Sequence, residues 1–161
     1  MKAPYQRATD WSELFECIRA QQPKTVIFDV EPLVAHWNTD EQALRRGVAR
    51  VLDEGLAAAG AETVVFAMNS WRRPAVMPDG RGVRVRYLHA AGKPFRVAPY
   101  RTLPRPGVIV GDQVAVDGVL AWRLGYSFIH YCPDLAAVPV GPRIVMYLNR
   151  PLRRLLFVQR P

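Results

Sequence analysis

The sequence predicts an α/β fold, a single domain built on a doubly wound, Rossmann-like parallel sheet of about five strands with flanking helices. Short β-branched apolar runs lie at residues 25–30, 63–68 and 108–110, and such runs are typical of strands that are buried on both faces. Segments with helical periodicity alternate with these runs. That alternation indicates parallel strands joined by crossover helices.

The N-terminal segment, residues 1–23, is expected to contain a short amphipathic helix. Residues 10–20 follow a possible cap, Thr9 or Asp10, and their apolar side chains recur at helical spacing, at Trp11, Leu14, Phe15 and Ile18. The first strand then covers residues 25–30. Residues 39–42 resemble a capping box, so a second helix is expected from there to about residue 59, with Gly60 as its stop.

The second half continues the same alternation. A second strand is expected at residues 63–68, and residues 83–88 alternate with period two, which predicts a half-exposed edge strand. Four prolines allow only a short helix within residues 92–106. A strand at 108–110, a helix over 114–124 that ends at Gly125, and a strand at 127–131 follow. A length of 161 residues is that of one ordinary domain and no domain boundary is visible, so we expect residues 1–161 to form one domain.

The C-terminal segment, residues 143–161, mixes apolar and basic side chains. One interpretation is a helix that packs on the sheet, begun by Pro151 as its first residue. The other is an interfacial basic segment that contacts an anionic membrane surface.

Composition excludes several classes of protein. Half of the 161 residues are hydrophobic, so disorder over most of the chain is excluded, and no apolar run approaches the roughly 18 residues needed to span a bilayer. The N-terminus lacks the apolar core of a secretion signal. Cys17 and Cys132 are far apart, which favours two buried thiols in a reducing compartment. We therefore expect a cytoplasmic protein, with peripheral membrane contact as an option for the C-terminal segment.

The formal charge of +8 arises mostly from arginine, which makes up 19 of the 22 basic residues. Biased codon usage would produce this excess, and so would a partner that carries phosphates, which arginine pairs with bidentately. Nucleic acid is the less favoured partner, because aromatic platforms are sparse among the arginines and no nucleic-acid-binding module is present.

Polar side chains follow four successive predicted strands, where the carboxyl ends of parallel strands meet at one rim of the sheet. In strand order they are Asp29 and Glu31, Asn69 and Ser70, Lys93, and Asp112 with Asp117. The three histidines, His36, His89 and His130, have no metal-like spacing and are interpreted as structural.

This set of groups suits hydrolytic phosphoryl transfer. Asp29 would attack phosphorus, and Glu31 would protonate the leaving oxygen and then activate water. Lys93, Asn69 and Ser70 would bind the phosphoryl oxygens, and Lys93 would also lower the pKa of Asp29. Further carboxylates complete an oxygen site for Mg²⁺, so the predicted side-chain ligands are Asp29, Asp112 and Asp117.

The motifs resemble those of the haloacid dehalogenase (HAD) superfamily, and within it the small capless YqeG-like phosphatases. The resemblance covers about residues 24–154. Its most specific part is Gly111-Asp112-Gln113 followed by Asp117 and by Arg123-Leu124-Gly125-Tyr126. Gly92-Lys93-Pro94 matches the Lys-Pro motif, and Leu148-Asn149-Arg150 resembles the closing segment. It implies an aspartyl-phosphate on Asp29, Mg²⁺ as cofactor, and the Glu31 backbone carbonyl as a metal ligand.

Three residues depart from that family pattern. Glu31 stands where the family has Asp, Leu33 where it has Thr, and Met68 where it has a hydroxyl side chain. We therefore expect slow or absent turnover of generic phosphates, and the alternative function is a HAD-fold binding or regulatory protein with impaired catalysis. Some relatives act on a phosphorylated lipid, so the resemblance allows a large or lipid-linked phosphate substrate.

Overall fold

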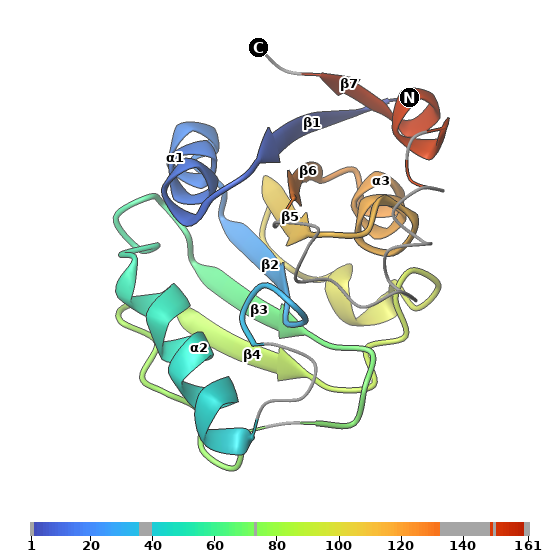
Figure 1. Cartoon of the computed structure of the whole chain (residues 1–161). Coiled ribbons are helices and arrows are strands. Elements are labelled where there is room, and N and C mark those ends of the chain that lie inside the picture. The colour runs from blue at the N-terminus through green and yellow to red at the C-terminus, as the bar shows by residue number, and fades with distance from the viewer. Residues whose placement is uncertain (1, 36–39, 73, 133–148, 150, 160–161) are drawn as a thin grey trace.

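The computed structural model describes residues 2–35, 40–72, 74–132, 149 and 151–159. Within them, seven strands form one parallel sheet in the order β4-β3-β2-β5-β6-β1-β7 (Figure 1). The strands are β1 (Ala3–Ala8), β2 (Thr25–Asp29), β3 (Thr63–Ala67), β4 (Arg84–Leu88), β5 (Gly107–Gly111), β6 (Ser127–Tyr131) and β7 (Phe157–Gln159). The predicted α/β class with a parallel sheet is confirmed, with seven described strands rather than about five.

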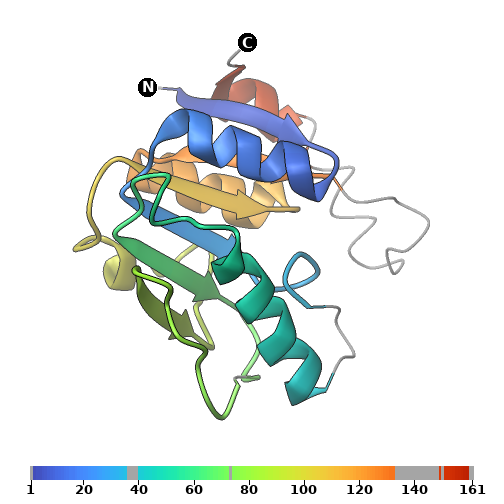
Figure 2. The ribbon, with the colours of Figure 1, turned by 90° about the vertical axis from the view of Figure 1, so that its left-hand side faces the viewer.

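Helices cover both faces of the sheet. Helices α1 (Trp11–Gln21) and α2 (Glu41–Asp53) lie on one face, and α3 (Val119–Leu124) lies on the other (Figures 1 and 2). A π-helical turn, η2 (Val114–Gly118), leads directly into α3, and a short 3₁₀ turn, η1 (Ala98–Tyr100), occupies the proline-rich stretch. Helix α3 ends at Gly125, as predicted.

Alternate side chains of the central strands point to opposite faces, which produces two hydrophobic cores. In β2, Val26 and Phe28 join the core under α1 and α2, whereas Ile27 joins the core under α3. All five β2 residues are buried. Such double burial explains why the strand reads as a continuous apolar run instead of an alternating one.

Side-chain caps fix the starts of the two long helices. The Asp10 carboxylate accepts a hydrogen bond from the Glu13 amide at 2.9 Å, and Asp40 caps α2. Helix α2 ends at Asp53, so the predicted extension to residue 59 is wrong. Gly55 adopts a φ of +70°, in the left-handed region that glycine tolerates best, and this conformation stops the helix before the predicted stop.

Two strands were not predicted. Strand β1 alternates buried Ala3 and Tyr5 with more exposed side chains, and β7 pairs with it at the sheet edge. The C-terminal residues 151–156 are helical, and the adjoining Phe157 is buried in the core under α3. Packing on the sheet is therefore confirmed for this part of the tail, while residues 143–148 lie outside the described residues. Among the helices that the structure describes, none is both long and apolar enough to cross a membrane.

The strand order creates a topological switch point between β2 and β5. From β2 the chain adds β3 and then β4 on one side, and it later adds β5 and β6 on the other. In open parallel sheets, ligands bind at the carboxyl ends of the strands beside such a point. Asp29 ends β2, and Asp112 follows β5 directly.

Candidate active site

Three aspartates meet at the switch point. Asp29 closes β2, Asp112 follows β5, and Asp117 comes from the π-helical turn η2. One carboxylate oxygen from each lies within 4.8 Å of the others, and all three residues are buried. The prediction that Asp29 and Asp112 lie close together is confirmed, and the group is close enough to bind a metal ion.

Gly111 allows Asp117 to approach the end of β5. A Cβ atom at position 111 would lie 2.4 Å from the Asp117 carboxylate, closer than packing permits. The Asp117 amide donates to the Gln113 carbonyl at 2.8 Å, which folds η2 back toward the strand. The close approach of Asp117 therefore requires glycine at position 111, directly before Asp112.

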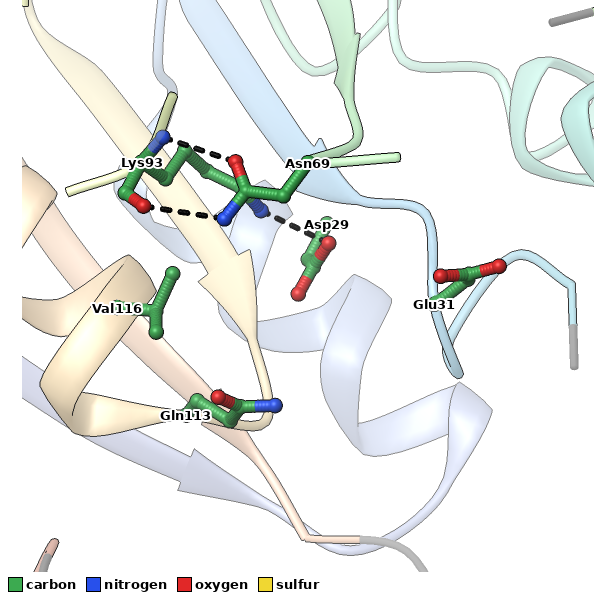
Figure 3. A pocket seen from close by; sticks show the side chains of 6 residues that line it. All are labelled: Asp29, Glu31, Asn69, Lys93, Gln113 and Val116. Carbon is green, nitrogen blue, oxygen red and sulfur yellow. Dashed lines mark hydrogen bonds and ion pairs between the residues drawn. The ribbon is translucent and has the colours of Figure 1, made fainter. Parts of the chain in front are cut away.

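The Lys93 ammonium joins two of these carboxylates. Its Nζ lies 2.8 Å from Asp29 Oδ1 and 2.7 Å from Asp117 Oδ1, and the lysine side chain is 2% exposed. Figure 3 shows the ammonium reaching toward Asp29 from the neighbouring loop. The expectation that Lys93 lies beside Asp29 is confirmed.

Asn69 holds the Lys93 backbone in place. Its side-chain amide donates to the Lys93 carbonyl at 3.0 Å, and its Oδ1 accepts from the Lys93 amide at 2.9 Å (Figure 3). This two-point clamp connects the loop after β3 to the loop after β4. Because one amide group satisfies both backbone groups, Asn69 positions Lys93 in addition to lining the pocket.

Burial sets the protonation of the carboxylates. Burial, followed by repulsion from Asp117, raises the pKa of Asp112 to about 7. The same two effects raise the pKa of Asp29 well above its ordinary value, although Lys93 lowers it. Lys93 therefore lowers the Asp29 pKa as expected, but burial and Asp117 outweigh it and the net shift is upward. Burial alone would lower the pKa of Lys93, but Asp117 and Asp29 raise it, so the ammonium stays charged.

The three aspartates have more binding capacity than their neighbours use. Both oxygens of Asp112 and Oδ2 of Asp117 are buried without a hydrogen-bond partner within the described residues. When ionised, three carboxylates exceed the single charge of Lys93 by two. Oxygen donors with a double negative excess suit a hard divalent cation.

Glu31 lies on the pocket wall but pairs with a side chain from the loop after β3. Its Oε1 is 2.7 Å from Arg72 Nη1, and in Figure 3 Asp29 lies between Glu31 and Lys93. Burial raises the pKa of the Glu31 carboxyl, and Arg72 opposes that rise. The structure therefore holds Glu31 near Asp29 in an ion pair with Arg72.

Two residues after β3 lie elsewhere than the motifs suggested. Met68 is 1% exposed and belongs to the core under α1 and α2, where its sulfur accepts from the Tyr87 hydroxyl at 3.6 Å. Ser70 is not among the pocket-lining residues of the described chain, and its hydroxyl is buried without a partner there. Of the three consecutive residues 68–70, only Asn69 lines the pocket.

The pocket also has residues that sequence reasoning missed. Its volume is about 110 Å³, and its lining is Asp29, Glu31, Asn69, Lys93, Gln113 and Val116. Gln113 directly follows Asp112, so its position next to a predicted metal ligand could have indicated that it lines the site. Val116 had no such signal, because its place depends on the π-helical turn.

The closing segment contributes a buried amide. Asn149 is 3% exposed, and its Oδ1 accepts from the Ala115 amide at 3.1 Å, at the start of η2.

Comparison with protein-family models, curated proteins and solved structures finds no match to this chain. The functional argument therefore depends on the residues of the site.

Proposed function

We propose that this protein is a Mg²⁺-dependent phosphohydrolase of the HAD type that acts through an aspartyl-phosphate on Asp29. The observation that carries the proposal is the buried Lys93 ammonium, which lies between Asp29 and Asp117 beside the switch point. A fixed cation and a carboxylate at the mouth of a small pocket suit attack on a phosphoryl group.

The aspartates support Mg²⁺ as the cofactor. Asp29, Asp112 and Asp117 would hold the ion through carboxylate oxygens. Asp112 and Asp117 have buried oxygens without a hydrogen-bond partner among the described residues. The resemblance adds the Glu31 backbone carbonyl as a further ligand. A bound divalent cation supplies the positive charge that keeps the carboxylates ionised and neutralises a phosphoryl oxygen.

The chain's own residues account for the proton and bond changes. An Asp29 oxygen forms a bond to phosphorus while the ester P–O bond breaks, and Glu31 gives its proton to the departing alkoxide. The Glu31 carboxylate then takes a proton from water, whose oxygen attacks phosphorus and releases Asp29 and orthophosphate. Lys93 offsets charge on the transferred group in both steps.

The size of the pocket limits what enters it. The pocket volume of about 110 Å³ is well above the roughly 10–15 Å³ that one water needs, so a small polar group can enter it. A phosphoryl group fits this space, and the remainder of the substrate would lie outside it. An open site of this kind suits a large or lipid-linked phosphate.

A second candidate is a HAD-fold binding or regulatory protein that retains phosphate and Mg²⁺ but turns substrate over poorly. The Glu31–Arg72 ion pair favours it, because Arg72 stabilises the charged form of the group that must donate a proton. Loss of a hydroxyl at Met68 also removes a phosphoryl-binding group that the resemblance would supply.

Phosphate release from p-nitrophenyl phosphate tests the proposal. Wild type should release phosphate only with Mg²⁺, and Asp29→Asn should abolish release and the acid-stable phosphoenzyme seen by mass spectrometry. Asp53→Asn is the matched control, since Asp53 is 56% exposed and pairs with Arg81. Phosphate and Mg²⁺ binding without turnover would favour the second candidate. Absence of both turnover and binding would exclude both candidate functions.

A further inference from the structure

We infer that His130 is a positioning residue for the metal site, because its Nε2–H anchors the backbone of Asp112 while Tyr5 holds the opposite side of the ring. The inference rests on the proposed metal site at Asp29, Asp112 and Asp117. It assigns a role to a histidine that sequence spacing left as structural, and to a strand that was not predicted.

The sheet register brings His130 beside the end of β5. In the β5–β6 pairing, His130 is the partner of Gly111, the residue before Asp112. The His130 Nε2 lies 2.9 Å from the Asp112 carbonyl oxygen. A carbonyl oxygen only accepts hydrogen bonds, so Nε2 must carry the proton in this contact.

Tyr5 completes the assignment from the other side of the ring. The Tyr5 hydroxyl lies 2.8 Å from His130 Nδ1. In a neutral imidazole with its proton on Nε2, Nδ1 is an acceptor, so Tyr5 donates to it. Burial of His130 favours the neutral ring, because it lowers the pKa of the imidazole. The direction of both hydrogen bonds follows from these atoms.

The anchor matters because, among the described residues, no hydrogen-bond partner orients the Asp112 carboxylate. Both of its oxygens are buried without a hydrogen-bond partner in the described part of the chain. The direction of the side chain therefore depends on the backbone that carries it. His130 holds that backbone at Asp112, and Asn149 holds it three residues later, at the Ala115 amide.

Tyr5 is itself held rigidly. It is 2% exposed and packs against the rings of Phe128 and Phe157. Strand β1, which lies between β6 and β7, thus supports the site through the Tyr5 hydroxyl, which contacts His130, which in turn contacts Asp112. Groups that orient metal ligands from behind typically change metal affinity about 10–100-fold when they are removed.

Mn²⁺ binding, followed by electron paramagnetic resonance, and histidine ¹⁵N NMR test this inference together. In wild type the ring should show a single neutral tautomer with the proton on Nε2. His130→Leu should weaken Mn²⁺ binding about 10–100-fold, whereas His130→Gln should recover most of the affinity, because its amide can still donate to Asp112. Tyr5→Phe keeps the ring packing and leaves the Asp112 carbonyl contact in place, so the proton should stay on Nε2 and binding should weaken less.

The outcomes separate this inference from the proposed function. Wild-type affinity in a folded His130→Leu, or a proton on Nδ1 in wild type, would overturn the positioning role while leaving the metal site intact. If His130→Leu does not fold, a Mn²⁺ affinity in Tyr5→Phe equal to that of wild type would overturn it instead. A wild type that binds no Mn²⁺ would overturn the proposed metal site itself. His89→Leu serves as a control, because His89 packs against the exposed Trp71 ring.

Discussion

Lys93 Nζ lies 2.7 Å from Asp117 Oδ1, and both side chains are almost completely buried. Asp29 shares the same ammonium at 2.8 Å. One buried cation therefore serves two carboxylates, and a third carboxylate, Asp112, has neither ion pair nor hydrogen-bond partner within the described residues. This imbalance underlies the first two predictions.

Lys93→Met should destabilise the protein and abolish Mg²⁺-dependent phosphate release. Removing one member of a buried ion pair leaves the other charge uncompensated, which costs about 3–5 kcal/mol. Urea unfolding measures the loss. Lys24→Met is the matched control, because Lys24 pairs with Glu62 at 2.9 Å with about half of each side chain exposed, and such pairs contribute up to about 1 kcal/mol. Equal losses in the two variants would contradict the buried pairing.

Stability of the metal-free protein should fall as pH rises from about 4 to 7. The folded pKa of Asp112 is about 7, above the ordinary value of 3.8, so its contribution is fully present below pH 4 and lost as the folded group ionises. Asp29 acts in the same direction. Asp112→Asn should remove up to about 4 kcal/mol of this dependence. Urea unfolding in EDTA at pH 5 and pH 8 measures it; Asp53→Asn should leave the slope unchanged.

Added Mg²⁺ should reverse that trend. The ion binds ionised carboxylates, so its affinity should rise with pH through about 7, and binding should release protons. Isothermal titration calorimetry in buffers of different ionisation enthalpy measures the proton count. Affinity that is flat between pH 5.5 and 8 would show that Asp112 is already ionised in the metal-free protein.

Glu31→Asp should raise turnover of p-nitrophenyl phosphate if the extra methylene of Glu31 limits the reaction, since about 1 Å of misplacement can cost roughly a hundredfold. Arg72→Gln should raise the pKa of the Glu31 carboxyl, because Arg72 lowers it in wild type. The pH at which turnover depends on ionisation of Glu31 should therefore rise. Met68→Ser would restore the hydroxyl of the family pattern, but it should cost about 2–5 kcal/mol of stability because it leaves a cavity in the core. Wild-type turnover of roughly tens per second, typical of ordinary enzymes, would show that Glu31 is already competent.

The C-terminal segment should contact anionic lipid through the side chains that the core leaves exposed. Leu155 is 69% and Val158 55% exposed beside Arg154. Leu155→Asp should reduce sedimentation with anionic vesicles while stability stays unchanged, and Val76→Asp, at a similarly exposed apolar position, should not. Equal sedimentation of wild type with anionic and neutral vesicles would rule out this contact.

Much of the site followed from sequence because its parts are local. Asp29 and Asp112 each end a short apolar run, and strand ends are set by neighbouring residues. Parallel pairing then brings those ends to one rim, so Asp29, Lys93, Asp112 and Asp117 were all expected in the same place. The caps and the α3 stop at Gly125 were predictable for the same reason, since each involves residues a few positions apart.

Other features depended on contacts between distant parts of the chain. Strand β1 has only three buried side chains, so its pattern was too weak to read before β6 and β7 were placed beside it. The turn of Met68 into the core, and the pairing of Glu31 with Arg72, were equally invisible, because a motif records spacing and not the direction in which a side chain packs.

The sequence alone determined the α/β class and the four strand ends that carry polar groups, because hydrophobic periodicity and strand-terminal residues are local properties. The tertiary structure decided how those groups share charge and what holds them. Lys93 is divided between Asp29 and Asp117, and His130 reaches Asp112 only because β5 and β6 are neighbours in the sheet. Burial and long-range hydrogen bonds are set by which strands become adjacent, and that information exists only once the chain has folded.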